Sequence, residues 1–284
     1  MTAPGRPGPP YVGRIAALAT RHGKESLIAP ALAPCGLTVI VADVDTDTFG
    51  TFTGEIPRHG DPLQVATRKA RAAIAAAGTD AGLASEGSFG PHPAAPFLTA
   101  DLELVVLVDD RHGITIAEQA LSFDTAAAAV TLRPGEDAGR FCAQVGFPGQ
   151  ALICRPGDGT RDHITKAITS LGALRTAIGL AARGSRDGTA IIETDLRAHL
   201  CPTRRAVISQ AARRLAERLG RICPACARPG YGASRHEPGL PCGQCGLPSQ
   251  APAATITWCP ACGYQRRSAA TGTADPAGCQ FCNP

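Results

Sequence analysis

Short apolar runs separated by polar turns recur along the first two thirds of the chain. Runs of about four to eight apolar residues between glycine, proline or aspartate are typical of buried strands. The runs of this kind are 13–20, 37–42, 81–85, 102–108, 114–123, 151–154 and 189–194. The run 37–42 (LTVIVA) is apolar at almost every position, which predicts a strand covered on both faces.

Helical periodicity is clearest between Asp61 and Gly78. Asp61 followed by Pro62 is a strong helix start, and Gly78 is a natural stop. The apolar stripe between them consists of Leu63, Ala66, Ala70, Ile74 and Ala77. Three further helices are predicted at about 135–146, 166–182 and 203–219.

These elements predict an α/β protein with a mixed sheet, a long antiparallel hairpin and flanking helices. The hairpin is indicated by the turn DDRHG (109–113) between two apolar runs. We expect a disordered Pro/Gly-rich segment at 1–12. An α/β domain is expected at 13–220, comprising 13–130 and a continuation, 131–220, that ends in an arginine-rich helix. A separate C-terminal tail is expected at 221–284.

Composition narrows the class of protein. Hydrophobic residues make up 44% of the chain and aromatic residues only 4%, so the core must consist mostly of Ala, Val, Leu and Ile. The net charge of +4 is too small to indicate a nucleic-acid or membrane partner. The chain shows neither a signal-peptide apolar region nor an apolar run of membrane-spanning length, so a cytoplasmic location is expected.

The tail contains eight of the 12 cysteines, arranged as four Cys-x-x-Cys pairs. The pairs are Cys223/Cys226, Cys242/Cys245, Cys259/Cys262 and Cys279/Cys282. Each pair forms a knuckle that presents two thiolates, and a tetrahedral Zn²⁺ needs two knuckles. We therefore predict a double zinc-ribbon-like tail with two zinc ions. Sequential pairing is the simplest arrangement, and a cross-braced pairing of the first knuckle with the third is the alternative.

The expected role of this zinc is structural. Four thiolates saturate each ion and leave no open position for catalysis. Between the knuckles the tail is rich in proline and glycine, so metal binding must supply most of its folding energy. Eight thiolates holding two zinc ions would give the tail a formal charge of −2, which does not favour a phosphate backbone. The other cysteines are expected to be small buried hydrophobes: Cys35, Cys142, Cys154 and Cys201.

Lysine is rare here, with three copies against 25 arginines. Lys69 lies alone on one flank of the helix that follows Asp61, and Glu86 follows the run 81–85 into a glycine-rich turn. A lysine beside carboxylates at loop and strand ends suits a phosphorylated, metal-bound ligand. The plainer interpretation of Lys24, Lys69 and Lys166 is that they are solvated surface residues.

A second group of ionisable residues lies between positions 193 and 205. If this segment is extended, four side chains share one face: Glu193, Asp195, Arg197 and His199. The helix that follows could hold an anion at its start with backbone N–H groups and Arg204 or Arg205. The alternative is an ion-paired strand end followed by a solvated arginine face.

The chain is identified as similar to an uncharacterised bacterial family, domain of unknown function 6671. The matching stretches are ATRHGKE, DTDTFGTFTGEIPR, ASEGSFGPHP, ETDLRAHLCPTR, the Cys-x-x-Cys tail and the closing CQFCNP. This resemblance assigns no reaction.

Residues 14–124 also resemble the inosine/xanthosine triphosphate pyrophosphatases. Thr20 and Lys24 match that family's opening turn, Glu55 its glutamate loop, Lys69-Ala70 its helix and Glu86-Gly87 its strand end. The resemblance implies that lysines hold phosphates while carboxylates hold Mg²⁺, which activates water. Residues 189–284 have no counterpart in those enzymes.

Three functions follow as hypotheses. The first is a Mg²⁺-dependent hydrolase or binder of nucleotides or other phosphorylated metabolites. Glu55 and Glu86 would hold the metal and Lys24 and Lys69 the phosphate, with the 193–199 group and Arg204 as a second wall. The second is a non-enzymatic zinc ribbon that docks on nucleic acid or on a protein through the arginines of 204–218. The third is a catalytically inactive scaffold.

Overall fold

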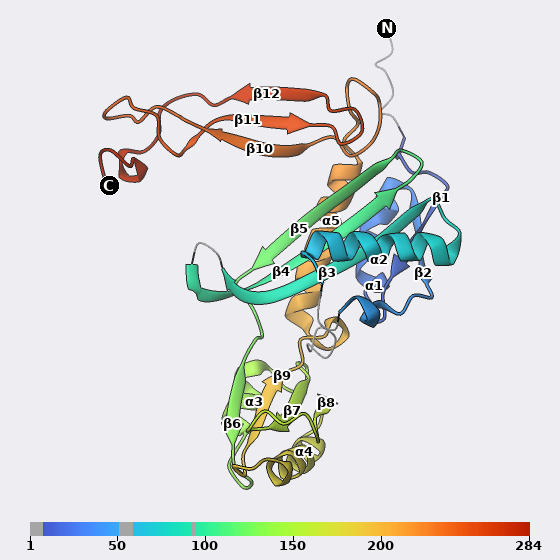
Figure 1. The fold of residues 1–284 in the computed structure, drawn as a ribbon, viewed down its shortest axis with the longest axis vertical. Coiled ribbons are helices and arrows are strands. Elements are labelled where there is room, and N and C mark those ends of the chain that lie inside the picture. Colours follow the sequence, from blue (N-terminus) through green and yellow to red (C-terminus); the bar gives the residue numbers. More distant parts are fainter. Residues whose placement is uncertain (1–7, 51–58, 93–94) are drawn as a thin grey trace.

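The computed structural model describes residues 8–50, 59–92 and 95–284, which form three separate sheets (Figure 1). The largest sheet has the strand order β2-β1-β3-β4-β5. Its strands are β1 (Arg14–Ala19), β2 (Leu37–Ala42), β3 (Ala81–His92), β4 (Ala95–Asp109) and β5 (Ile114–Ser122). β1 runs parallel to β2 and β3, whereas β3, β4 and β5 are antiparallel. The predicted mixed α/β fold is confirmed.

Helices cover both faces of this sheet. On one face, α1 (Glu25–Leu32) and α5 (Pro202–Leu219) bury their apolar residues against β1, β3, β4 and β5. On the other face lies α2 (Pro62–Ala77), packed on small residues such as Ala17, Ala84 and Val106 (Figure 1). Such small side chains allow the helix to approach the sheet closely.

The caps of α2 are those that the sequence predicts. The Asp61 side chain accepts a hydrogen bond from Gln64 N at 2.9 Å, and Gly78 ends the helix with a φ of 64°. The predicted stripe is partly wrong, because Leu63 is exposed while Val65 and Lys69 are buried. The buried face of α2 packs against β3 and includes Lys69. The apolar pattern alone does not predict this, because lysine is not apolar.

Two strand predictions are also corrected. The run 37–42 is not covered on both faces: β2 is an edge strand, and Val41 is 53% exposed. Glu86 does not lead into a turn. β3 continues to His92, because every residue from Gly87 to Pro91 pairs with β4. Glu86 therefore lies within a strand and is held rigidly.

The second sheet is built from the middle of the chain and has its own apolar core. Its strands, in the order β6-β9-β7-β8, are β6 (Ala129–Leu132), β9 (Ala190–Thr194), β7 (Leu152–Pro156) and β8 (Thr165–Ile168). Two helices accompany it, α3 (Gly139–Val145) and α4 (Leu171–Gly184). The helix predicted from residue 166 begins only at Leu171, because Ser170 is its N-cap and accepts a hydrogen bond from Ala173 N at 3.3 Å.

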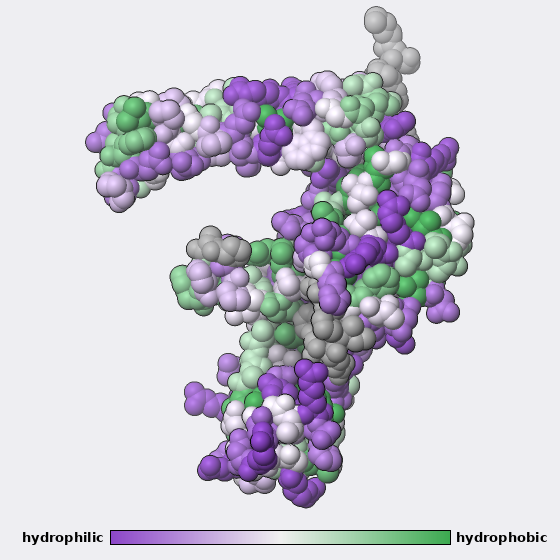
Figure 2. Space-filling view, viewed as in Figure 1, coloured by the Kyte–Doolittle hydropathy of each residue, from purple (hydrophilic) through white to green (hydrophobic). Residues whose placement is uncertain are grey.

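The third sheet is the tail, with strands β10 (Ala233–Pro238), β11 (Pro252–Trp258) and β12 (Gln265–Ala269) in sequence order. It projects from the end of α5 with open space beneath it (Figures 1 and 2). Short 3₁₀ turns complete the structure: η1 (Ala33–Cys35), η2 (Thr46–Phe49), η3 (Ala198–Leu200) and η4 (Pro276–Gly278). Among the described residues, no helix has the length and apolar composition that a membrane crossing requires.

Candidate functional site

A small polar cavity lies where β1 is flanked on one side by β2 and on the other by β3. The connection from β1 to β2 contains α1, which lies on one face of the sheet. The connection from β2 to β3 contains α2, which lies on the other face. Such a switch point, at the carboxyl ends of parallel strands, is where open α/β sheets bind ligands. The cavity, about 50 Å³ in volume, is lined by Ala19, Thr20, Arg21, His22, Lys24, Thr46, Asp47, Gly50, Lys69, Ser85, Glu86, Gly87, Arg197 and Arg204. We call it the cationic cavity.

Lys24 lies at the N-terminus of α1 and points into this cavity. Its ammonium donates a hydrogen bond to Ser85 Oγ at 2.9 Å and forms no ion pair with any described residue. Burial, together with the nearby charge of Arg204, lowers the pKa of Lys24 to about 8. Lys24 is partly buried, with the charges of Glu103 and Glu86 nearby, and an anion in the cavity would further favour its charged form.

Lys69 and Glu86 form an ion pair on the opposite wall. Both side chains are buried, so the interpretation of Lys69 as a solvated residue is wrong. The structure thus brings Lys24, Lys69 and Glu86 together from three separate segments. Glu55, the remaining member of the predicted set, lies outside the described residues.

Arg204 enters the cavity from the first turn of α5 and is almost completely buried. Its Nε donates to Glu103 Oε1 at 2.5 Å, and its Nη1 donates to Leu196 O at 2.7 Å. A Cβ added to Gly87 would overlap both the Arg204 guanidinium and the Glu103 carboxylate. The absence of a side chain at Gly87 is therefore what lets this arginine lie flat against β3.

Glu103 and Asp101 are buried acidic residues of β4 that sequence reasoning missed. Among the described residues, neither Asp101 oxygen has a hydrogen-bond partner, nor has Glu103 Oε2. Burial and the adjacent Glu103 charge raise the pKa of Asp101 to about 7. The sequence could have indicated this pair of residues, because residues two apart in a strand point to the same face. Asp101 and Glu103 therefore share a face of β4.

The predicted second wall is only partly assembled. The extended segment with one shared face is wrong, because β9 ends at Thr194 and the chain then turns into η3. Arg197 lines the cationic cavity and also a second cavity, which it shares with Glu193; Glu193 pairs with Arg155 and does not line the cationic cavity. His199 stacks on His22, with ring centroids 5.2 Å apart.

Asp195 fixes the position of Arg197. It is fully buried and accepts hydrogen bonds from Arg197 Nε at 2.9 Å and Nη2 at 2.6 Å. Although burial favours the neutral acid, these bonds hold the pKa of Asp195 below its ordinary value. It also accepts a hydrogen bond from Ala167 N at 3.1 Å, which ties the second sheet to the cavity wall.

The tail brings its cysteines together as two tetrads. The proximal site, next to the end of α5, consists of Cys223, Cys226, Cys259 and Cys262. The distal site consists of Cys242, Cys245, Cys279 and Cys282. The chain thus adopts the cross-braced pairing, and the simpler sequential pairing is wrong. Each knuckle turns back on itself, and the three strands between the knuckles place the first beside the third and the second beside the fourth.

Both tetrads fit a tetrahedral zinc ion. Zn–S bonds of about 2.3 Å require sulfur atoms about 3.8 Å apart. The Sγ atoms of Cys223 and Cys262, and those of Cys242 and Cys282, are 3.8 Å apart. The four unpaired cysteines of the remaining chain are buried, as predicted. The described residues therefore contain two four-cysteine groups that could each hold a metal ion, consistent with structural zinc.

The proximal site is fastened to the α/β body. Arg218 Nε donates to Gly230 O at 3.0 Å, and Arg228 Nη1 donates to His112 O at 3.3 Å, in the turn between β4 and β5. Ala261 packs against the main core.

The sequence model of a family described as a domain of unknown function, DUF6671, matches residues 69–284. The chain belongs to this family. The match spans Lys69, Glu86, Arg204 and every cysteine of the two tetrads. Neither the curated proteins nor the solved structures contain a match. The fold and chemistry of this DUF6671 protein must therefore be argued from its own residues.

Proposed function

We propose that this DUF6671 protein is a Mg²⁺-dependent hydrolase of nucleotides or other phosphorylated metabolites, with the cationic cavity as its phosphate site. The observation that supports this most directly is Lys24, a partly buried cation that forms no ion pair with a described residue and lies at the switch point of the sheet.

The charges of the cavity favour an anion. Its described lining contains five cationic side chains and two carboxylates, Asp47 and Glu86. Four of the five cations form ion pairs, and Lys24 is the one without an ion pair among the described residues. Three of these cations, Lys24, Arg197 and Arg204, enter from one side, and Lys69 enters from the other. A phosphoryl group placed among them would accept charge-assisted hydrogen bonds, which are the strong ones.

The size of the cavity favours a phosphoryl group over a whole nucleotide. Its 50 Å³ has room for a few water molecules. The remainder of a larger ligand must therefore extend out of it.

We expect a magnesium ion to use the two carboxylates of the described lining, Asp47 and Glu86, which also pair with Arg21 and Lys69. Mg²⁺ is commonly held by one or two carboxylates together with substrate phosphates, and Asp47 and Glu86 line the same cavity. Bound Mg²⁺ would supply charge neutralisation and an activated water. The chain's own residues would bind and orient the phosphate: Lys24 and Arg204 as donors, with Ser85 and Glu103 fixing their positions.

The test is turnover of a nucleoside-triphosphate panel with Mg²⁺, read by released pyrophosphate or phosphate. Hydrolysis of at least one member is expected, and Glu86→Gln should abolish it while Glu136→Gln, an exposed loop change, should not. No turnover and no thermal shift with any phosphorylated ligand would overturn the proposal.

A further inference from the structure

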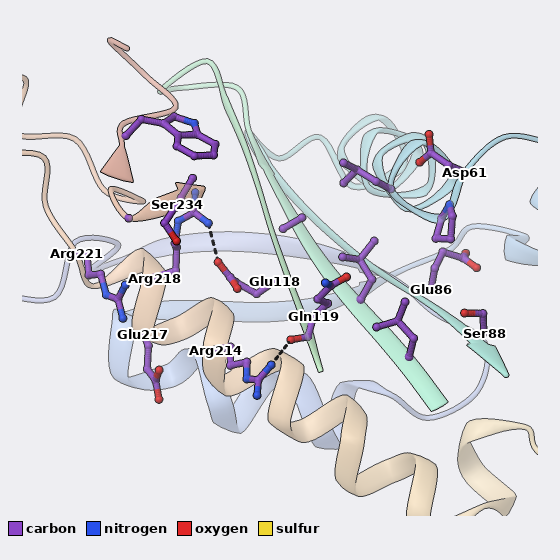
Figure 3. A pocket seen from close by; sticks show the side chains of 18 residues that line it. Asp61, Glu86, Ser88, Glu118, Gln119, Arg214, Glu217, Arg218, Arg221 and Ser234 are labelled. Atoms are coloured by element: carbon purple, nitrogen blue, oxygen red, sulfur yellow. Dashed lines mark hydrogen bonds and ion pairs between the residues drawn. The ribbon is translucent and has the colours of Figure 1, made fainter. Parts of the chain in front are cut away.

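A second, much larger cavity lies beside the cationic cavity and is not explained by phosphate binding. It runs across β4 and β5, between the start of α2 and the base of the tail (Figure 3). Its volume is about 760 Å³, within the roughly 300–1,000 Å³ typical of sites for organic ligands. We call it the tail groove.

The tail groove and the cationic cavity share a wall. Glu86 lines both of them, with its ion-pair partner Lys69 on the side of the cationic cavity. In Figure 3, Glu86 and Ser88 lie at one end of the groove, and Ser234 of the tail lies toward the other. The two cavities therefore adjoin at Glu86, and a ligand that spans them would place its phosphate in one and its remaining part in the other.

The floor of the groove is apolar and its rim is polar. Leu102, Leu104 and Ala117 form the floor on one face of the sheet, and Trp258 enters from the tail. Gln119 and Ser88 offer polar groups beside this floor. A flat apolar surface with an indole and a few hydrogen-bonding groups suits a ring system.

The charges of the groove do not suit a chain of phosphates. Its described lining has four acidic residues against three arginines. Two of those arginines are occupied: Arg218 pairs with Glu118 at 2.6 Å, and Arg214 donates to Gln119 O at 2.7 Å. Nucleic-acid backbones require a clear cationic surplus. The groove is therefore suited to an uncharged organic group.

We infer that the tail groove binds the ring-bearing part of the same phosphorylated ligand, with Trp258 of the tail as an aromatic contact. This inference rests on the proposed phosphate site. It specifies the substrate class as a nucleotide-like molecule, with one charged end and one aromatic end, and excludes a bare polyphosphate. It also gives the tail a direct part in ligand binding.

Trp258 is the only tryptophan, so the tryptophan fluorescence arises from a single residue of the groove lining. The experiment is a titration of the zinc-loaded full-length protein with non-hydrolysable nucleoside-triphosphate analogues and, separately, with inorganic pyrophosphate. At least one analogue is expected to bind tenfold or more tightly than pyrophosphate and to change the Trp258 emission, whereas pyrophosphate binds without that change.

Two variants test the groove from opposite sides. Trp258→Leu, followed by calorimetry, should remove most of the analogue's advantage over pyrophosphate and leave two zinc ions per chain. Ala117→Arg fills the floor from β5, far from the cysteines in sequence, and should have the same effect. Tyr264→Leu, a tail residue outside the groove lining, is the matched control.

Equal affinities for analogues and pyrophosphate, with constant fluorescence, would overturn the groove inference and leave the phosphate site standing. If pyrophosphate also fails to bind, the proposed function itself is wrong. The two failures are therefore distinguishable.

Discussion

A few charged side chains determine the character of the cationic cavity. Lys69 attracted attention in the sequence because lysine is rare, but its burial against Glu86 depends on how closely α2 approaches β3. Asp101 and Glu103 were not predicted as site residues, because Asp101 directly precedes the apolar run 102–108 and Glu103 lies within it, and that run predicts a buried strand. Residue type alone could identify candidate site residues. Their burial depends on how the elements pack, which the sequence does not show.

The Lys69–Glu86 pair predicts non-additive effects on stability. Removing one partner of a buried ion pair leaves an uncompensated charge and costs about 3–5 kcal/mol. Lys69→Met and Glu86→Gln should each show a loss of this size in chemical denaturation. The double variant should lose less than the sum, yet fail to bind pyrophosphate. Additive losses would mean that the two side chains do not interact.

Asp101 predicts a specific pH dependence. Its folded pKa of about 7 lies above the ordinary value of 3.8, so the folded state binds the extra proton. Its contribution to stability is therefore complete at low pH and is lost as the pH rises through 7. The charged and titratable groups around it are Glu103, Arg204 and Lys24.

Asp101→Asn removes this titration. The change that it makes in the free energy of unfolding should be more favourable at pH 8 than at pH 5, by about 2 kcal/mol or more. Thermal unfolding across this range measures it. An unchanged pH profile would show that Asp101 is ionised throughout.

At the scale of elements, sequence patterns predicted the helices and strands better than their ends. Caps made α2 predictable, since Asp61, Pro62 and Gly78 act locally. The end of β3 was not predictable, because Gly87 and Gly90 look like a turn until β4 pairs with them. The segment after β9 was predicted to be extended, but it turns into η3. The turn lies where the buried Asp195 carboxylate accepts hydrogen bonds from Arg197.

Gly87 and Gly90, both in β3, provide a matched pair of substitutions. Gly87→Ala should displace Arg204 and lower affinity for phosphate by about tenfold, the loss expected for one charged hydrogen bond. Gly90→Ala meets no atom within 4 Å and should have little effect. Pyrophosphate titration of both variants compares them directly. Equal affinities in the two would contradict the role given to Arg204.

At the scale of the whole molecule, the number of four-cysteine sites was predictable from the sequence, whereas the pairing of their knuckles was not. Four similar knuckles at similar spacings are compatible with either arrangement, and only the order of β10, β11 and β12 decides between them. The division of the α/β part into two sheets follows likewise from contacts distant in sequence. Most arginines of α5 form hydrogen bonds or ion pairs within the molecule. Few of them are therefore left for the predicted contact with nucleic acid or a protein partner.

The two four-cysteine sites should contribute differently, because among the described residues it is the proximal site that is fastened to the body. Cys262→Ser and Cys245→Ser each remove an exposed ligand from one tetrad. Metal analysis should find two zinc ions per wild-type chain and fewer in each variant. The proximal change should lower the melting temperature of the body and shift the Trp258 emission, and the distal change should do neither. Identical behaviour of both variants would contradict this assignment.

The central claim is that Lys24 holds a phosphate at the switch point of the sheet. Calorimetric titration of pyrophosphate at pH 7 with Mg²⁺ tests it directly, with Lys24→Met as the variant and Lys166→Met, in the second sheet, as the control. We predict one site per chain, an affinity at least tenfold lower for Lys24→Met, and no change for Lys166→Met. Equal affinity in all three proteins, or no binding in any, would contradict the account.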